Sequence, residues 1–287
     1  MRDFYRVMDS IAARYDSIFG DTLSDHILAK ANPWIVDTLA GMQYETMMAR
    51  DSFVYDQRNL IVFKKGDSLR IPRKVEIETI MKDFSETVLD LNIPEYKMRI
   101  LVGKDTLYSI KTRVGRNERK HLDMAGTEIW LGTDKGTGKI IRHEKYPLFI
   151  NPADNHRYYV TRRDDYRTTK TPLIPWIEAE LDGQRKGDLI HPTTNPVTLG
   201  KPYSNGCVGV SEADAWRVYF NAPLGTKVIF RYDLRVKDEK GDTIKLRDIY
   251  GYPPKVIPLP VLPPVPPQDS MRSPDSLDSI PGVKKDS

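Results

Sequence analysis

The spacing of the apolar residues changes near residue 86, and this change constrains the fold more than any other feature of the 287-residue sequence. After it, polar and apolar residues alternate in short segments separated by turns, which is the pattern of β-strands. Before it, apolar residues recur every three or four positions with charged residues between them, as on the buried face of a helix: Phe4, Val7, Met8, Ile11, Tyr15 and Ile18. The sequence therefore predicts a helical region followed by a mainly β domain.

We expect four helices in the first 85 residues. The first covers 4–19 and the second begins near Thr22. The third has Asn32 as its N-cap and Pro33 at its first helical position, where the missing N–H costs nothing. The fourth covers 73–84. The residues between the third and fourth helices, from 53 to 72, have the composition of an extended segment with a turn at 65–67.

Two phrases in this region resemble the opening and closing of a LysM glycan-binding module. They are residues 20–23, which read GDTL, and residues 66–72, which read GDSLRIP. The same letters are also common turn chemistry. A plain helical cap on the following domain is the alternative interpretation of residues 1–85.

The β domain is expected to cover residues 86–234, with one helix that follows Ser211. Ser211 is the predicted N-cap, and Asp214 stands three positions later in a variant of the capping box. The buried stripe of this helix would be Trp216, Tyr219 and Phe220. The predicted strands are 89–93, 96–102, 106–110, 111–114, 128–131, 140–141, 148–150, 158–160 and 226–232.

The remainder, residues 235–287, is predicted to be an extension with a Pro-rich linker and a disordered tail. Residues 253–267 hold eight of the 21 prolines, and the chain beyond them is rich in Ser, Asp and Pro. Such a composition favours an extended spacer over a packed domain. The expected organisation is therefore a helical region, a β domain and an extension.

Charge and hydropathy exclude several classes of protein. Lys and Arg number 44 against 40 Asp and Glu, and the basic residues are spread along the chain, so nothing favours nucleic-acid binding. No stretch has the 18 or so apolar residues of a membrane span. Residues 1–10 lack the apolar core of a signal peptide, so we expect either a cytoplasmic protein or a sequence from which a targeting segment is absent.

The single cysteine, Cys207, excludes an internal disulfide and any site built from several cysteines. No histidine lies at metal-ligand spacing from another ligand, so no metal or cofactor is expected. His143-Glu144 begins a phrase like that of zinc proteases, but Pro147 stands at the position of the second histidine. The glycine-rich residues 132–139 lack the spacing of a phosphate-binding loop and are predicted to form a turn between strands.

Cys207 and His191 are the strongest candidates for chemistry. A thiol with a pKa of about 8.5 is mostly protonated at neutral pH, so a cysteine nucleophile needs a nearby base or aimed dipoles. His191 lies sixteen positions upstream, and adjacent antiparallel strands would bring the two together. The alternative is that Cys207 is a small buried apolar residue, as lone cysteines often are.

The neighbours of Cys207 are small enough to admit a substrate. Gly206 lets the backbone approach a carbonyl closely, and the N–H groups of Gly206 and Cys207 are then available as oxyanion donors. The helix that follows Ser211 would direct its positive end toward this region and favour the thiolate.

Residues 190–208 read IHPTTNPVTLGKPYSNGCV and resemble the signature of the YkuD-type L,D-transpeptidase catalytic domain. The family reads approximately I-H-G-T, then a glycine, then S-x-G-C-hydrophobic-R. The residues at matching positions are His191, Gly200, Ser204, Gly206 and Cys207. The resemblance covers roughly residues 86–234 and implies a β-sandwich-like fold, so the expected fold class is mainly β with helices (α+β).

The resemblance implies an enzyme that acts on the stem peptides of bacterial peptidoglycan, without metal or cofactor. Cys207 would form a thioester with the third residue of one stem, and an amine of another stem would resolve it into a 3→3 cross-link. His191 would be the general acid and base, oriented by a carbonyl that Pro192 supplies. Carbapenems would be covalent inhibitors. The site of action would be the periplasm or cell envelope.

This chain departs from the family pattern at three positions. Pro192 replaces the glycine after the histidine, Asn205 replaces a frequent histidine, and Gly209 replaces a frequent arginine. Asn205 keeps the capacity to donate a hydrogen bond, and Ser204, Gly206 and Pro192 would help to position the substrate. Because the arginine is missing, recognition of the carboxylates of the stem falls to other residues, for which Arg162, Arg163, Arg167 and Tyr159 are candidates.

Two further interpretations stay open. The same site would act as an L,D-carboxypeptidase or endopeptidase if water resolved the thioester, or as a protein-anchoring enzyme if the acceptor were a protein. Alternatively, the departures at Pro192 and Gly209 would suit a peptidoglycan-binding protein without catalysis.

Overall fold

The structure is a computed structural model that describes residues 1, 3–19, 23–123, 125–151, 153–187 and 189–252. The described residues up to Gly251 form one compact unit. The predicted Pro-rich linker and tail, residues 253–287, lie outside the described residues. The account below therefore concerns this compact unit.

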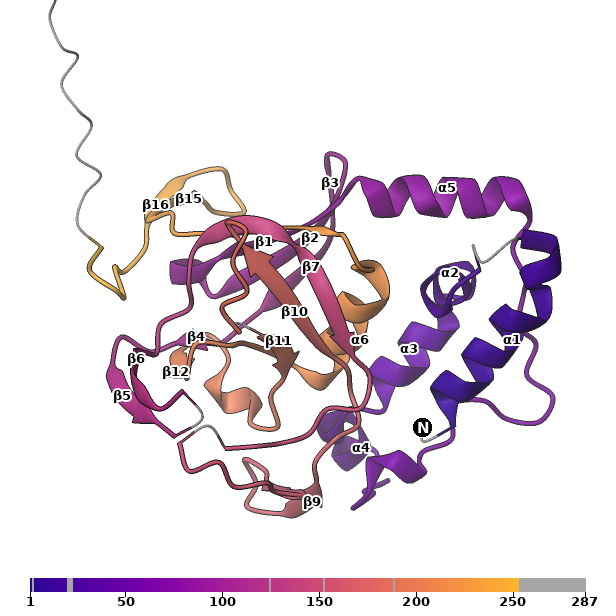
Figure 1. The fold of residues 1–287 in the computed structure, drawn as a ribbon, viewed down its shortest axis with the longest axis horizontal. Helices are drawn as coiled ribbons and strands as arrows, with labels where there is room; N and C mark the ends of the chain where they lie inside the picture. The colour runs from indigo at the N-terminus through magenta and orange to yellow at the C-terminus, as the bar shows by residue number, and fades with distance from the viewer. Residues whose placement is uncertain (2, 20–22, 124, 152, 188, 253–287) are drawn as a thin grey trace, which may run out of the picture. The chain divides into compact units, whose positions relative to one another are not determined.

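The N-terminal helices gather beside the sheet (Figure 1). The predicted helices over 4–19 and 73–84 are confirmed within a residue at each end. The helices are α1 (Phe4–Phe19), α2 (Asp25–Ala31), α3 (Trp34–Gly41), α4 (Tyr44–Ala49), the 3-10 helix η1 (Gln57–Asn59) and α5 (Lys74–Ser85).

Three details of this region differ from the prediction. Asn32 is not the N-cap of α3, because its amide donates to the carbonyls of Leu28 and Arg70 and so closes α2 instead. The segment predicted to be extended pairs with no strand at 60–63, where Phe63 stacks on Phe4 with 5.4 Å between ring centroids. Helix α4 was not predicted. Of the LysM-like phrases, residues 20–22 lie outside the described residues, and residues 66–72 form no regular element.

An eight-stranded sheet forms the centre of the unit. The hairpins β1–β2 and β2–β3 confirm the strands predicted between residues 89 and 110. Parallel pairing joins β1 to β14 and β11 to β13, and the other neighbours are antiparallel. In order across the sheet, the strands are β13 (Val208–Val210), β11 (Leu189–Pro192), β10 (Trp176–Leu181), β7 (Gly136–Glu144), β14 (Lys227–Arg231), β1 (Thr87–Asn92), β2 (Lys97–Val102) and β3 (Asp105–Lys111).

The two edges of this sheet are connected by the chain that leaves β3. Arg113 and Gly209 exchange both backbone hydrogen bonds, at 2.8 and 2.9 Å, as an antiparallel bridge. Since Gly209 belongs to β13 at the opposite edge, the sheet curves nearly into a barrel. Closure of this kind satisfies backbone groups that an open edge would leave exposed. The mainly β class with N-terminal helices is confirmed.

Eight short strands form two-stranded pairs around the large sheet. The predicted strand at 128–131 is confirmed by β6, but no strand forms at 148–150, where Ile150 makes only an isolated bridge to Arg157. The pairs are β4 (Val114–Gly115) with β12 (Pro202–Ser204), β5 (Arg119–Leu122) with β6 (Thr127–Trp130), β8 (Val160–Arg162) with β9 (Thr168–Lys170), and β15 (Arg235–Lys237) with β16 (Thr243–Lys245).

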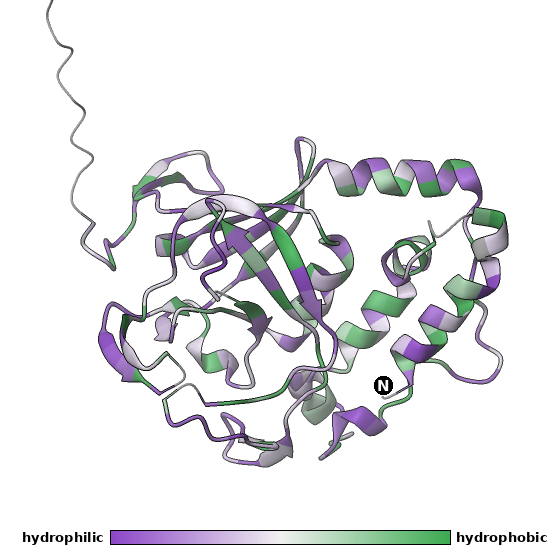
Figure 2. Ribbon diagram, viewed as in Figure 1, coloured by the Kyte–Doolittle hydropathy of each residue, from purple (hydrophilic) through white to green (hydrophobic). Residues whose placement is uncertain are grey.

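Helix α6 (Glu212–Asn221) joins the helical region to the sheet domain, and it begins where predicted. Helices α2 and α3 pack against it. Trp216, Tyr219 and Phe220 are each at most 1% exposed, as the stripe predicted, and Phe4 and Tyr5 of α1 make edge contacts with their rings. Figure 2 shows hydrophobic residues along α3. Along α5, at the edge of the unit, hydrophobic and hydrophilic residues alternate.

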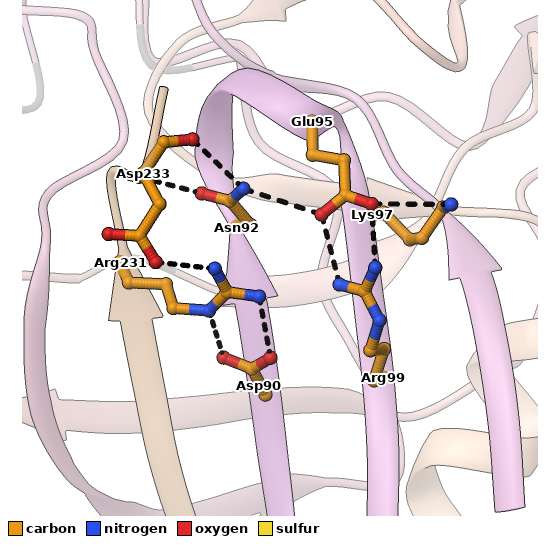
Figure 3. Close-up of polar contacts among 7 residues, drawn as sticks. All are labelled: Asp90, Asn92, Glu95, Lys97, Arg99, Arg231 and Asp233. Carbon is orange, nitrogen blue, oxygen red and sulfur yellow. Dashed lines mark hydrogen bonds and ion pairs between the residues drawn. The ribbon is translucent and has the colours of Figure 1, made fainter. Parts of the chain in front are cut away.

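Ion pairs fix the ends of β1, β2 and β14 (Figure 3). The guanidinium of Arg231 donates to both oxygens of Asp90, at 2.7 and 3.0 Å, across the parallel pair β1–β14. Arg99 makes the same two-pronged contact with Glu95. Bidentate pairs hold orientation as well as charge, so the Arg231–Asp90 pair supports the register of β1 against β14, and the Arg99–Glu95 pair ties β2 to the 3-10 turn before it. Among the residues described, no helix has the length and apolar character needed to cross a membrane.

Candidate active site

Cys207 and His191 lie on neighbouring strands, although not in the predicted orientation. Cys207 directly precedes β13, and His191 lies in β11 with Gly209 as its partner. The two strands are parallel, so the expectation of antiparallel strands was wrong. Parallel neighbours need a crossover of a dozen or more residues, and the fifteen residues between His191 and Cys207 provide one that contains η3 (Pro196–Thr198) and β12.

One hydrogen bond defines the tautomer of His191. Its Nδ1 lies 2.9 Å from the carbonyl oxygen of Pro192. A carbonyl can only accept, so Nδ1 carries the hydrogen and Nε2 keeps the lone pair. The ring of Trp176 packs against the imidazole, with 5.3 Å between centroids. His191 is thus held in the form that accepts a proton at Nε2.

The pKa of His191 is lowered to about 4. Burial is the largest cause and the charge of Arg113 adds to it, while the hydrogen bond to Pro192 opposes both. His191 is therefore neutral at physiological pH and its Nε2 can accept a proton, although a lowered pKa by itself makes the imidazole a weaker base toward a thiol.

The turn that precedes Cys207 is held by two side-chain hydroxyls. Gly206 has a φ of 110°, a backbone conformation that residues with a side chain rarely adopt. Its carbonyl accepts a hydrogen bond from Oγ1 of Thr133 at 2.5 Å. Ser204 Oγ donates to the carbonyl of Cys207, also at 2.5 Å. In a planar trans peptide the N–H points away from the preceding carbonyl. Anchoring the carbonyl of Gly206 therefore fixes the direction of the Cys207 N–H.

Thr133 and Tyr250 support this turn and were not identified from the sequence. The hydroxyl of Thr133, fully buried, accepts from the N–H of Gly115 at 2.8 Å while it donates to Gly206. The phenol of Tyr250 accepts from Thr133 N–H and donates to the carbonyl of Gly115. Residues 132–139 were predicted to be only a turn, and β7 in fact begins at Gly136. No sequence pattern joins these three segments.

Asn205 lies beside the nucleophile candidate and is oriented by Arg116. The guanidinium of Arg116 donates to Oδ1 of Asn205 at 2.8 Å. Because Oδ1 accepts this bond, the amide nitrogen of Asn205 points away from Arg116. The predicted role of Asn205 as a donor stays a prediction.

The candidates for carboxylate binding lie around the β8–β9 pair, in different environments. Tyr159 is 59% exposed and stacks with Arg157. Arg162 stacks over Tyr166. Arg163, in contrast, is 2% exposed and its guanidinium is paired with Glu212 in the interior. Arg163 is therefore engaged by the protein itself.

The first turn of α6 carries two carboxylates. Ser211 caps the helix by accepting from the N–H of Asp214, as predicted, and Glu212 occupies the first helical position. Acidic side chains in this turn neutralise part of the positive end of the helix dipole. The predicted contribution of the dipole to the thiolate is reduced accordingly.

Comparison with known proteins shows the family to which the chain is similar. The sequence model of the L,D-transpeptidase catalytic domain family, YkuD, matches residues 86–230, just over half of the chain. No curated protein matches the chain in sequence.

Among solved structures, an L,D-transpeptidase from Mycobacterium smegmatis is similar at 17% identity and a TM-score of 0.35, over 51% of this chain and 58% of that one. An L,D-transpeptidase from Xylanimonas cellulosilytica is similar at 15% identity and a TM-score of 0.38, over 69% and 78%. L,D-transpeptidase 3 from Mycobacterium tuberculosis, with a faropenem-derived adduct, has 14% identity and a TM-score of 0.34, over 51% and 60%. The chain thus spans less than two thirds of the first of these.

Proposed function

The chain belongs to the L,D-transpeptidase catalytic domain (YkuD) family, and we propose that it forms 3→3 cross-links between peptidoglycan stem peptides through a thioester on Cys207. The observation that carries the proposal is the state of His191. Its Nδ1 donates to Pro192, so Nε2 is the unprotonated nitrogen, and its strand pairs with the strand that Cys207 precedes. These are the properties of a general base for a thiol.

In the acylation step, Nε2 of His191 takes the proton of Cys207. The thiolate attacks the carbonyl carbon of the third, diamino acid residue of a stem peptide, and the N–H of Cys207 stabilises the oxyanion. When the carbon–nitrogen bond breaks, the imidazolium of His191 gives its proton to the leaving amine of D-alanine. The product is a thioester on Cys207.

In the second step, the side-chain amine of another stem attacks the thioester. His191 takes a proton from the attacking nitrogen, and the carbon–sulfur bond breaks as the new amide forms. The thiolate that leaves is reprotonated by His191. Only the acceptor distinguishes this reaction from transfer to water or to a protein.

The test is a muropeptide digest analysed by mass spectrometry after incubation with tetrapeptide stems. Transpeptidation gives new 3→3 dimers, whereas loss of D-alanine alone indicates a carboxypeptidase and cleavage of existing cross-links indicates an endopeptidase. Cys207→Ala abolishes the product and also the covalent adduct with a carbapenem such as imipenem, measured by intact mass. Dimers formed by Cys207→Ala would refute the proposal.

A peptidoglycan-binding protein without catalysis is the candidate from another class. Its support was the departures from the family pattern at Pro192 and Gly209, yet Pro192 still accepts the hydrogen bond of His191. A thiol probe distinguishes the two, because an inert cysteine reacts slowly with a midpoint near about pH 8.5. Since its substrate lies outside the cytoplasmic membrane, we propose that the protein works in the cell envelope, which cell fractionation tests.

A further inference from the structure

Three residues on adjacent segments form a row across the candidate site. Gly209 in β13 has His191 of β11 as its partner on one side and Arg113 on the other. Residues directly opposite on paired strands point to the same face of a sheet. The side chains of Arg113 and His191 therefore lie on one face, with a position between them that has no side chain.

The side chain of Arg113 occupies the space above Gly209. A Cβ built on Gly209 would lie 2.5 Å from Nε, 2.6 Å from Cγ and 2.9 Å from Cδ of Arg113. Gly209 is not among the glycines with positive φ, so its backbone conformation tolerates a side chain. Glycine is needed here for space, and the space is taken by Arg113.

The charge of Arg113 acts on both candidate catalytic residues. After burial, the charge of Arg113 is the second cause that lowers the pKa of His191. Burial also lowers the pKa of Arg113 itself, and the charge of Cys207 opposes that shift. Tyr158, Tyr203 and Asp164 act on Arg113 in the same direction as Cys207. An arginine keeps its proton at neutral pH despite such burial, so a cation faces the site.

The hydrogen bonds of Arg113 leave a donor available. Nη1 donates to Oγ1 of Thr198 at 3.3 Å. Nε is buried and, among the residues described, has no hydrogen-bond partner. A buried donor without a partner is costly, and a donor on a cation is best satisfied by an anion.

We propose that Arg113, from the segment after β3, places its guanidinium in the space above Gly209 and there stabilises the thiolate of Cys207. The thiol proton passes to Nε2 of His191, and Arg113 keeps its own protons throughout. Gly209 and Arg113 form one unit in this arrangement, since a side chain at 209 excludes that of Arg113. The proposal rests on Cys207 as the nucleophile of the proposed function.

The test is the pH dependence of Cys207 alkylation by iodoacetamide, measured on the full chain by intact mass. The wild-type midpoint should lie below about pH 8.5. Arg113→Ala should raise it by about one pH unit or more, which slows alkylation about tenfold below the midpoint. Arg113→Lys, which keeps the charge, should stay closer to the wild type. Arg217→Ala removes an arginine paired with Asp214 on α6 and serves as the control.

Moving the arginine from position 113 to position 209 distinguishes the effect of its charge from the effect of its packing. Arg113→Ala opens the space above Gly209, so the double variant R113A/G209R can place a guanidinium from β13 in the same region. We expect it to restore the midpoint toward that of the wild type. An unchanged midpoint in R113A, or a folded double variant that fails to restore it, would overturn the proposal. Thermal unfolding identifies variants that do not fold. If R113A or the double variant does not fold, R113K is the test: a low midpoint kept in R113K supports the proposal, and a midpoint raised to that of an ordinary thiol overturns it.

Alkylation needs no peptidoglycan, so the two proposals fail separately. A midpoint that depends on Arg113 in a chain that makes no cross-links refutes only the proposed function. Cross-linking by the wild type with a midpoint that ignores Arg113 refutes only the role of Arg113.

Discussion

Arg163 and Glu212 form an ion pair at 2.5 Å in which each side chain keeps only 1% of its surface exposed. Glu212 also accepts from the N–H of Tyr44 and from Gln57, so it connects α6 to α4 and η1. The pair therefore joins the β8–β9 region and the N-terminal helices to the helix that follows the candidate active site.

Removing one partner of this pair should destabilise the protein strongly. Arg163→Met leaves the charge of Glu212 buried without its main partner, and we expect a loss of about 3–5 kcal/mol in the free energy of unfolding. The double variant R163M/E212Q, which removes both charges, should recover part of the loss. Urea denaturation measures both. The exposed pair of Arg6 and Asp3 is the control, because Asp3→Asn should cost less than about 1 kcal/mol.

The hydroxyl of Thr133 should matter to the turn before Cys207. Thr133→Val keeps the shape of the side chain but leaves the carbonyl of Gly206 and the N–H of Gly115 without their partner. We expect a loss of about 1–3 kcal/mol in stability and slower alkylation of Cys207. Thr133→Ser restores the hydroxyl and should restore both properties. A Val variant as reactive and stable as the Ser variant would show that the hydroxyl does not hold the turn.

What the sequence predicted correctly is what neighbouring residues determine. Helices α1, α5 and α6 and the hairpins of β1, β2 and β3 follow from local periodicity, caps and turns. The strands β11 to β13 were not assigned because three or four residues are too few to show alternation, and β10 was missed although residues 177–181 alternate apolar and polar. The length of the connection between His191 and Cys207 was not used to infer parallel pairing.

The candidate site divides in the same way. Cys207, His191 and Gly206 were identified from residue type and spacing, and the resemblance to the family implied the carbonyl of Pro192. Thr133 and Arg113 reach the same site from distant segments, by the turn before β7 and the closure of the sheet. No local pattern marks either residue, since each acts through a contact that only the fold creates.

Stability should fall as the pH decreases below about 6.5. Burial, with the charge of Arg113 for His191 and of His26 for His143, lowers the pKa of these histidines to about 4 and about 3. Unfolded histidine has a pKa of about 6.5, so below that pH the unfolded chain binds more protons than the folded one. The stability they contribute is complete above pH 6.5 and is lost as the pH falls toward these values.

Urea denaturation between pH 7 and pH 4 measures this slope. The double variant H191N/H143N should show a flatter dependence than the wild type, because it lacks both titrating groups. His156→Asn, at an exposed position, is the control and should keep the wild-type slope. An equally steep slope in the double variant would assign the pH dependence to other groups.

Asp25 should attach the helical region to the sheet domain by its charge. It is 7% exposed and accepts from Tyr219 of α6 at 2.7 Å and from His26, while Lys145 lies 2.9 Å away. Burial alone would raise its pKa, but the hydrogen bonds and charges of His26 and Lys145 outweigh burial and lower it. The stability that this carboxylate contributes is therefore present above about pH 4 and is lost in stronger acid.

Asp25→Asn keeps the size of the side chain and removes the charge, so it should cost about 1.5–3 kcal/mol at neutral pH, the range for hydrogen bonds to a charged group. The same variant should lose less stability than the wild type when the pH falls below about 4, because Asn does not titrate. Asp9 also pairs with Lys145, at 3.5 Å, but is 63% exposed, so Asp9→Asn is the matched control and should cost less than about 1 kcal/mol. Equal losses in the two variants would mean that the charge on Lys145, rather than the buried position of Asp25, sets the energy of this contact.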